Sequence, residues 1–198
     1  MKAFRRVSGS VAVLDRADID TDQIIPKQFL KRIERSGYGE FLFFDWMKDA
    51  DFALRQPASR GASLLLTGRN FGCGSSREHA AWALEDAGFR AVLAPSFGDI
   101  FHANALKSGL LPIELDEDVL ALLRDALAAE NELTIDLERR EITHPGGLRV
   151  EFEIDPFARA MLLDGLDEIA LTLRREQEIA RYEAAHEPRF DTRALAER

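Results

Sequence analysis

The feature that most constrains the fold is an alternation of short apolar runs and helical segments between residues 62 and 107. Residues 62–67 and 90–94 have the length and composition of buried strands. Residues 75–87 and 96–107 are typical of helices, and Gly88 and Gly109 follow them as helix-terminating glycines. The order strand, helix, strand, helix predicts an α/β fold with a parallel βαβ core.

The flanking segments predict further elements around that core. Residues 4–14 indicate a bent strand or a hairpin, and residues 116–129 an amphipathic helix. Residues 133–137 and 148–154 alternate as strands do, with a turn at 144–147 between them. Pro156 is expected to open one helix, and residues 166–185 predict another. We expect one domain over 1–198, with a polar helix and tail over about 174–198.

Composition and charge exclude several classes of protein. The net charge of -9 argues against a nucleic-acid partner, which requires a basic face. The apolar runs are too short to cross a bilayer, and residues 1–7 are not followed by the apolar segment of a signal peptide. Cys73 is the only cysteine, so it can form no internal disulfide and can hold no iron–sulfur cluster alone. We expect a cytoplasmic protein that binds neither membrane nor nucleic acid.

The segment 70–80, Asn-Phe-Gly-Cys-Gly-Ser-Ser-Arg-Glu-His-Ala, lies between a predicted strand and a predicted helix. Gly72 and Gly74 allow a tight turn and close approach of the backbone. Ser75 is placed to cap the helix, which would leave free N–H groups that attract anions. Arg77 adds a planar guanidinium fork that suits a carboxylate. The segment therefore predicts an anion-binding loop.

A purely structural explanation competes with this prediction. Ser75 and Glu78 fit a capping box, which would account for both residues without any function. The capping box does not explain Arg77, because a helix dipole disfavours a cation in the first turn and an anionic ligand would compensate. The segment lacks the third glycine of a dinucleotide fingerprint, the Gly-Lys-Ser/Thr of a P-loop and the Gly-x-Ser-x-Gly of a hydrolase.

The segment 70–80 resembles the active-site signature of the swivelling domain of the aconitase superfamily, a β/β/α domain. Residues 20–30, beginning Asp-Thr-Asp, resemble the isopropylmalate dehydratase small subunits within that superfamily. The resemblance to these small subunits extends along nearly the whole chain, with motifs that occur in the same order. These motifs are residues 94–97, Asn104, 109–112 and 165–167. Cys73 stands where the aconitases proper have a glutamate, and there too the chain resembles the isopropylmalate branch.

The resemblance implies a hydro-lyase that interconverts 2-isopropylmalate and 3-isopropylmalate through 2-isopropylmaleate in leucine biosynthesis. It implies that this chain binds no cofactor itself and is inactive alone. Its partner in a heterodimer or higher complex would be a large subunit, whose own cysteines hold a [4Fe-4S] cluster that acts as a Lewis acid on the substrate hydroxyl.

The resemblance also implies roles for individual residues. Ser75 matches the catalytic base, and Ser76 and Arg77 match contacts to the substrate carboxylates. Asp22 matches a catalytic aspartate near the serine loop, although its neighbours Asp18 and Asp20 raise the alternative of loop caps.

Several other assignments stay open on sequence alone. Lys31 and Arg32 lie in the loop where the superfamily distinguishes substrates, but solvated loop charges are the alternative that the sequence favours. His79 could tune Ser75 from one turn along the helix or serve only in packing. Ile25, Phe29 and Leu30 could hold an isopropyl group or belong to the core. Two other functions remain: a related hydro-lyase subunit, for homoaconitate or methylmalate, and a non-catalytic anion-binding module.

Overall fold

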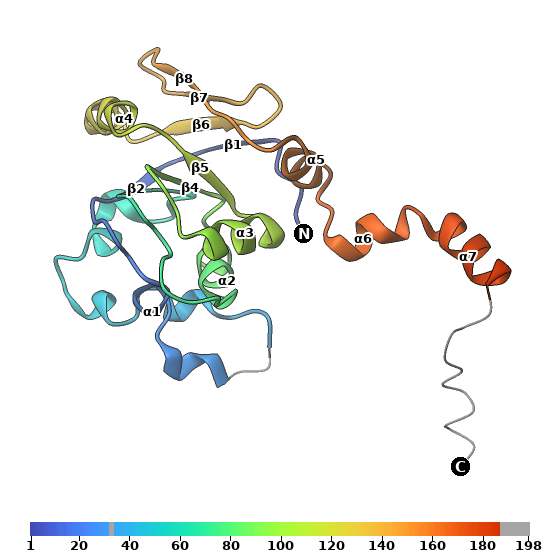
Figure 1. Ribbon diagram of the computed structural model, residues 1–198. Coiled ribbons are helices and arrows are strands. Elements are labelled where there is room, and N and C mark those ends of the chain that lie inside the picture. Colours follow the sequence, from blue (N-terminus) through green and yellow to red (C-terminus); the bar gives the residue numbers. More distant parts are fainter. Residues whose placement is uncertain (32–33, 187–198) are drawn as a thin grey trace.

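A computed structural model describes residues 1–31 and 34–186, in which two four-stranded sheets lie one above the other (Figure 1). The antiparallel sheet has the order β1-β6-β7-β8. Its strands are β1 (Arg6–Gly9), β6 (Leu133–Asp136), β7 (Glu141–Thr143) and β8 (Arg149–Glu151). The parallel sheet has the order β2-β3-β4-β5. Its strands are β2 (Val11–Leu14), β3 (Leu64–Thr67), β4 (Ala91–Ala94) and β5 (Leu111–Glu114).

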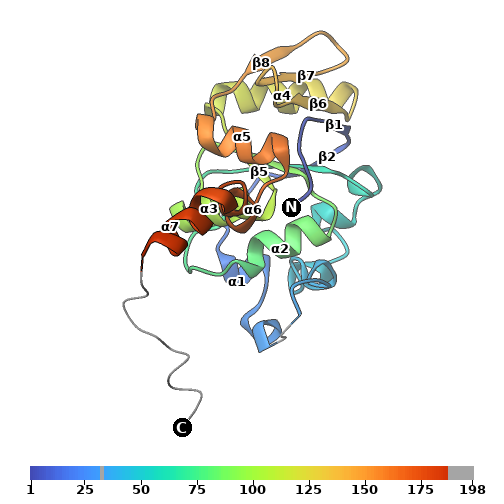
Figure 2. The ribbon, with the colours of Figure 1, turned by 90° about the vertical axis from the view of Figure 1, so that its right-hand side faces the viewer.

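Helices cover the parallel sheet on the side away from the antiparallel sheet. These are α2 (His79–Asp86) and α3 (Asp99–Ser108), with the single-turn helix α1 (Thr21–Ile24) near them (Figures 1 and 2). Helix α4 (Glu117–Ala129) follows β5, and α5 (Pro156–Asp164) follows β8. The last two helices, α6 (Glu168–Leu173) and α7 (Glu176–Ala185), lead away from the sheets (Figure 1). The described part of the chain also has five short 3₁₀ helices, at Lys27–Lys31, Gly39–Phe41, Trp46–Lys48, Ala53–Arg55 and Pro57–Ser59.

Strand β3 shows why the layers form in this order. All four of its residues are buried, and successive side chains point to opposite faces of the sheet. Leu64 and Leu66 join the core between the two sheets, which α4 also enters, whereas Leu65 joins the core under α2 and α3. A parallel sheet that is covered on both faces requires such a continuously apolar strand. The predicted α/β fold and its β/β/α layering are confirmed.

Several predicted boundaries were wrong for physical reasons. Helix α3 begins at Asp99 rather than Ser96, because the Ser96 hydroxyl accepts the backbone N–H of Asn70 (2.9 Å) instead of capping the helix. The run 4–14 is divided between two sheets as β1 and β2. Strand β7, of only three residues, was not predicted, and the 144–148 turn joins it to β8. Residues 166–185 form two helices, because Asp167 caps a short α6 that ends at Leu173.

Within residues 1–31 and 34–186, no helix is both long and apolar enough to cross a membrane.

Candidate active site

The segment that follows β3 is clamped between two other loops. An isolated parallel bridge pairs Asp20 with Cys73, and a second pairs Phe71 with Phe97. The backbone N–H of Gly72 donates to the Ile19 carbonyl at 2.7 Å. Gly72 also has a positive φ of 76°. Two loops from distant parts of the sequence therefore fix the path of the backbone toward Ser75.

Ser75 is held by α1, not by α2. Its hydroxyl lies 2.8 Å from the hydroxyl of Thr21, and its backbone N–H donates to the same Thr21 oxygen at 3.3 Å. Helix α2 begins four residues later, with Glu78 at its N-cap and no capping hydrogen bond from the Glu78 side chain. The predicted capping box of Ser75 and Glu78 is wrong, because the hydroxyl of Ser75 already has another partner. Capping therefore does not explain Ser75.

Arg77 forms an ion pair with Asp22 of α1. The Arg77 side chain is 20% exposed and that of Asp22 is 54% exposed, so the pair lies at the edge of the surface. The hydrogen bond from Arg77 lowers the pKa of Asp22, burial opposes this, and the charges of Arg77 and Lys27 lower the pKa further. Arg77 precedes α2 instead of lying in its first turn. Its charge is met by Asp22, so an external anion is not needed to explain it.

The three neighbouring aspartates have different roles. Asp20 is the N-cap of α1: its carboxylate accepts the N–H of Gln23 at 2.8 Å, and the Gln23 side chain accepts the N–H of Asp20 at 2.9 Å. The Asp18 carboxylate accepts the side-chain amide of Asn70 at 2.8 Å. The alternative of a cap is thus confirmed for Asp20, whereas Asp18 bonds the side chain of Asn70, and Asp22 is the one that faces Arg77.

The backbone after Ser75 offers donors for an anion. Among residues 1–31 and 34–186, no hydrogen-bond acceptor faces the backbone N–H groups of residues 76–80. The Ser76 side chain is exposed, and its carbonyl accepts the side-chain amide of Asn104 at 3.4 Å. Free N–H groups beside a guanidinium favour a carboxylate, as predicted for this loop.

The remaining candidate residues are not brought to Ser75. Lys31 is exposed at the end of its 3₁₀ helix, and within the described residues no hydrogen bond or ion pair joins it to the Ser75 loop. Arg32 lies outside the described residues. The imidazole of His79 packs against the rings of Tyr38 (5.1 Å between centroids) and Trp82 (4.7 Å), and burial lowers its pKa. His79 is therefore a packing residue.

The apolar candidates and the cysteine are also accounted for by packing. Ile25 is fully buried in the core, and the ring of Phe29 stacks on that of Phe41 at 4.0 Å. Burial raises the pKa of the Cys73 thiol, and the charges of Asp20 and Asp18 raise it further. Across the described residues, no three His, Cys, Asp or Glu side chains gather to hold a metal ion. This part of the chain does not fit a cluster or metal of its own.

Sequence reasoning missed Thr21. Its residue type gave no chemical signal, and only its place in the Asp-Thr-Asp motif at 20–22 marked it. In the fold it is the direct partner of Ser75, although 54 residues separate the two in sequence.

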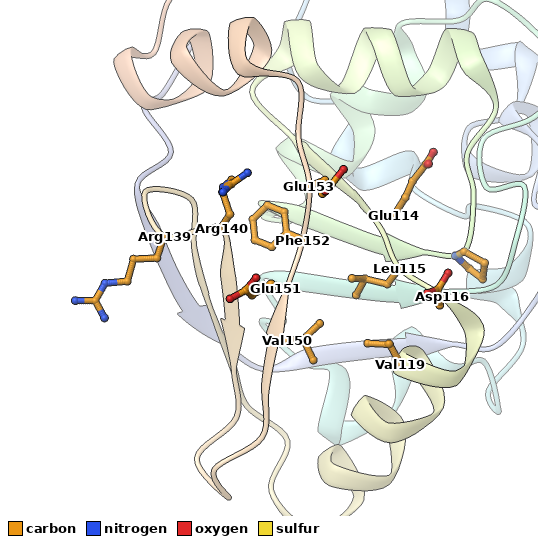
Figure 3. Close-up of a pocket in the computed structure, with 11 residues that line it drawn as sticks. Glu114, Leu115, Asp116, Val119, Arg139, Arg140, Val150, Glu151, Phe152 and Glu153 are labelled. Atoms are coloured by element: carbon orange, nitrogen blue, oxygen red, sulfur yellow. The ribbon is translucent and has the colours of Figure 1, made fainter.

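A hollow of about 650 Å³ lies elsewhere, between the start of α4 and the strand segment around β8 (Figure 3). Four carboxylates line it, from Glu114, Asp116, Glu151 and Glu153. The side chain of Arg139 extends away from the other labelled residues (Figure 3). Arg139 and Arg140 also line the hollow, but the carboxylates outnumber them. A lining with an excess of negative charge disfavours a dicarboxylate, so the Ser75 loop is the better place for an anionic substrate.

Comparison with known proteins gives concordant matches. A family model described as the aconitase C-terminal domain matches residues 1–118, and a model described as LeuD_N matches residues 121–156. Among curated proteins, a 3-isopropylmalate dehydratase small subunit from Geobacillus kaustophilus is 55% identical over 196 residues, which cover 96% of this chain and 100% of the relative. The protein of the same name from Bacillus subtilis is 51% identical, over 93% of this chain and 96% of its own length.

A solved structure agrees in fold. The crystal structure of a 3-isopropylmalate dehydratase from Methanocaldococcus jannaschii superposes with a TM-score of 0.67 at 26% identity. The match covers 89% of this chain and 99% of that structure.

Proposed function

Because the chain belongs to the family of 3-isopropylmalate dehydratase small subunits, we propose that its Ser75 loop supplies the base and the carboxylate contacts of that hydro-lyase. Membership of the family confirms the resemblance that the motifs predicted. The chain accordingly works with a large subunit in leucine biosynthesis, where 2-isopropylmalate and 3-isopropylmalate are interconverted by dehydration and rehydration.

The observation that carries the proposed site is the position of the Ser75 hydroxyl. It lies beside the buried hydroxyl of Thr21, in the loop that also carries Arg77. A serine hydroxyl is a weak base in water, and it becomes a useful one where nearby positive charge and N–H groups stabilise its alkoxide. Two features support this assignment: Arg77 lies two residues along the same loop, and no hydrogen bond within the described residues uses the N–H groups of residues 76–80.

Each residue then has a defined task. Ser75, as its alkoxide, takes the proton from the carbon next to a substrate carboxylate and becomes a neutral hydroxyl. The substrate hydroxyl on the adjacent carbon leaves and gains a proton from solvent to become water, which gives 2-isopropylmaleate. In the reverse direction Ser75 returns the proton to carbon. Arg77 and Ser76 bind a substrate carboxylate, and Asp22 holds the guanidinium of Arg77 in place through their ion pair.

We assign the rest of the reaction to the large subunit. A [4Fe-4S] cluster there would supply the Lewis acid that accepts the substrate hydroxyl. Lys31 and Arg32 of this chain would contact the variable end of the substrate once the two subunits meet. We place the complex in the cytoplasm.

Co-expression with a large subunit from a relative tests the proposal. Under anaerobic conditions the complex should hydrate 2-isopropylmaleate, a reaction followed by the loss of the absorbance of its double bond. Ser108→Ala is the matched control for Ser75→Ala. It removes the hydrogen bond from a serine hydroxyl on α3 to the Asn104 carbonyl, and the complex that carries it should stay active. A complex that assembles but hydrates only homologues such as citraconate would replace the proposed substrate. A complex that binds dicarboxylates without turnover would indicate an anion-binding module instead.

A further inference from the structure

Thr21 is a buried polar residue whose place in the fold is tightly fixed. It is the first residue of α1 and is 1% exposed. Its backbone N–H donates to the Cys73 carbonyl at 2.9 Å, and its carbonyl accepts the N–H of Ile25 at 3.0 Å. With both backbone groups engaged, the side chain can move little.

The two contacts of the Thr21 hydroxyl define the direction of its hydrogen. The oxygen accepts the N–H of Ser75 at 3.3 Å and lies 2.8 Å from the Ser75 hydroxyl oxygen. Between two hydroxyls either can donate. Once Ser75 has lost its proton, however, Thr21 alone can donate. Two hydrogen bonds then join the residues: the Ser75 N–H donates to the Thr21 oxygen, and the Thr21 O–H donates to the Ser75 alkoxide.

We propose that Thr21 is a positioning residue that orients the Ser75 hydroxyl and stabilises its alkoxide form. The inference rests on the proposed function, because it matters only if Ser75 is the base. A hydrogen bond to a charged oxygen is stronger than one to a neutral oxygen, and low surrounding polarity increases the difference. Thr21 therefore acts on the step in which Ser75 takes the proton and contributes little to substrate binding.

The hydrogen bonds of the Thr21 hydroxyl indicate which substitutions can test its role. Within the described chain the Thr21 hydroxyl has no hydrogen-bond partner other than Ser75. Valine has the shape of threonine without the hydroxyl, so Thr21→Val removes the hydrogen bond with little change in packing, and Thr21→Ser keeps it.

The test uses the complex with the large subunit. We expect Thr21→Val to lower kcat roughly 10- to 100-fold, because a hydrogen bond to a charged group is lost, with KM within about two-fold. Thr21→Ser should recover most of kcat. With a substrate deuterated at the carbon that loses its proton, the isotope effect on kcat should rise in Thr21→Val, because proton removal becomes slower. Thr67→Val is the matched control: Thr67 is also buried, donates to the Arg16 carbonyl at 3.4 Å, and should keep the parent kcat and isotope effect.

A second measurement does not depend on turnover. In the full small subunit alone, hydrogen exchange of the Ser75 amide should be at least about ten-fold faster in Thr21→Val, because its acceptor is lost. If Thr21→Val does not fold, Thr21→Ala takes its place in both measurements, since its smaller side chain cannot clash.

Ser75→Ala separates failure of this inference from failure of the proposed function. If Ser75→Ala is inactive while the hydroxyl-free Thr21 variant keeps the parent kcat, the role of Thr21 is overturned and that of Ser75 stands. A rise in KM alone would overturn it too, because that result indicates a substrate contact. If Ser75→Ala is fully active, both proposals fall.

Discussion

Gly72→Ala should destabilise the chain through two separate costs. The residue has a φ of 76°, which costs a residue with a side chain about 1–2 kcal/mol. A Cβ at this position would also lie 2.6 Å from the Cβ of Phe101 and closer still to its Cγ. Phe101 is 1% exposed and its ring packs against Phe71 at 5.2 Å, so it has no space to retreat. Overpacking of this kind adds about 1–3 kcal/mol. The free energy of unfolding should therefore fall by about 2–5 kcal/mol.

Urea denaturation of the full chain measures this loss, and two other glycines serve as controls. Gly74 and Gly88 also have positive φ, at 104° and 103°. A Cβ at Gly74 would make only an ordinary 3.5 Å contact with Asp20, and one at Gly88 would meet nothing within 4 Å. Gly74→Ala and Gly88→Ala should thus show the backbone cost alone, about 1–2 kcal/mol. Equal losses in all three variants would refute the close contact between Gly72 and Phe101.

Three further predictions concern the ion pair of the site and a helix cap. Asp22→Asn should lower the free energy of unfolding at pH 7 by about 0.2–1 kcal/mol, because the pair is partly exposed. The folded state lowers the pKa of Asp22, so the stabilisation is present above the unfolded pKa of about 3.9 and is lost as the pH falls through the folded pKa. A difference in the free energy of unfolding between parent and variant that widens in acid would contradict this. Arg77→Lys should raise KM because lysine loses the two-pronged carboxylate contact, and an unchanged KM in the complex would count against that role. Asp155→Ala should cost about 1 kcal/mol in urea denaturation and leave kcat unchanged, since Asp155 caps α5 by accepting the N–H of Ala158 at 2.9 Å; a loss near zero would argue against the cap.

The parallel core of the fold was predictable from local patterns, whereas the β/β/α layering came from the family resemblance. The apolar run that became β3 is buried on both faces, which is the pattern of a covered parallel strand. Gly88 and Gly109 end α2 and α3 with positive φ, as their positions in the sequence predicted. Pro156 opens α5 with Asp155 as its cap. In these places the local preference and the final fold agree.

The geometry of the site was not predictable because it depends on contacts distant in sequence. The spacing of Ser75 and Glu78 predicts a capping box, but the Ser75 hydroxyl forms a hydrogen bond with the Thr21 hydroxyl and does not cap α2. Arg77 was expected to need an external anion, but Asp22 of α1 provides the negative charge. No local propensity reports a partner more than 50 residues away. The family motifs indicated which residues to consider, but they did not indicate how these residues contact one another.

Abstraction of a proton by Ser75 is tested most directly by Ser75→Ala in the complex with the large subunit. The measurement is turnover of 3-isopropylmalate together with release of a deuterium label from the substrate carbon into solvent. Both should fall by about 10²–10⁴-fold, the usual contribution of a positioned base, while the two subunits still assemble. Turnover and label release within a few-fold of the parent complex would contradict the assignment of Ser75 as the base.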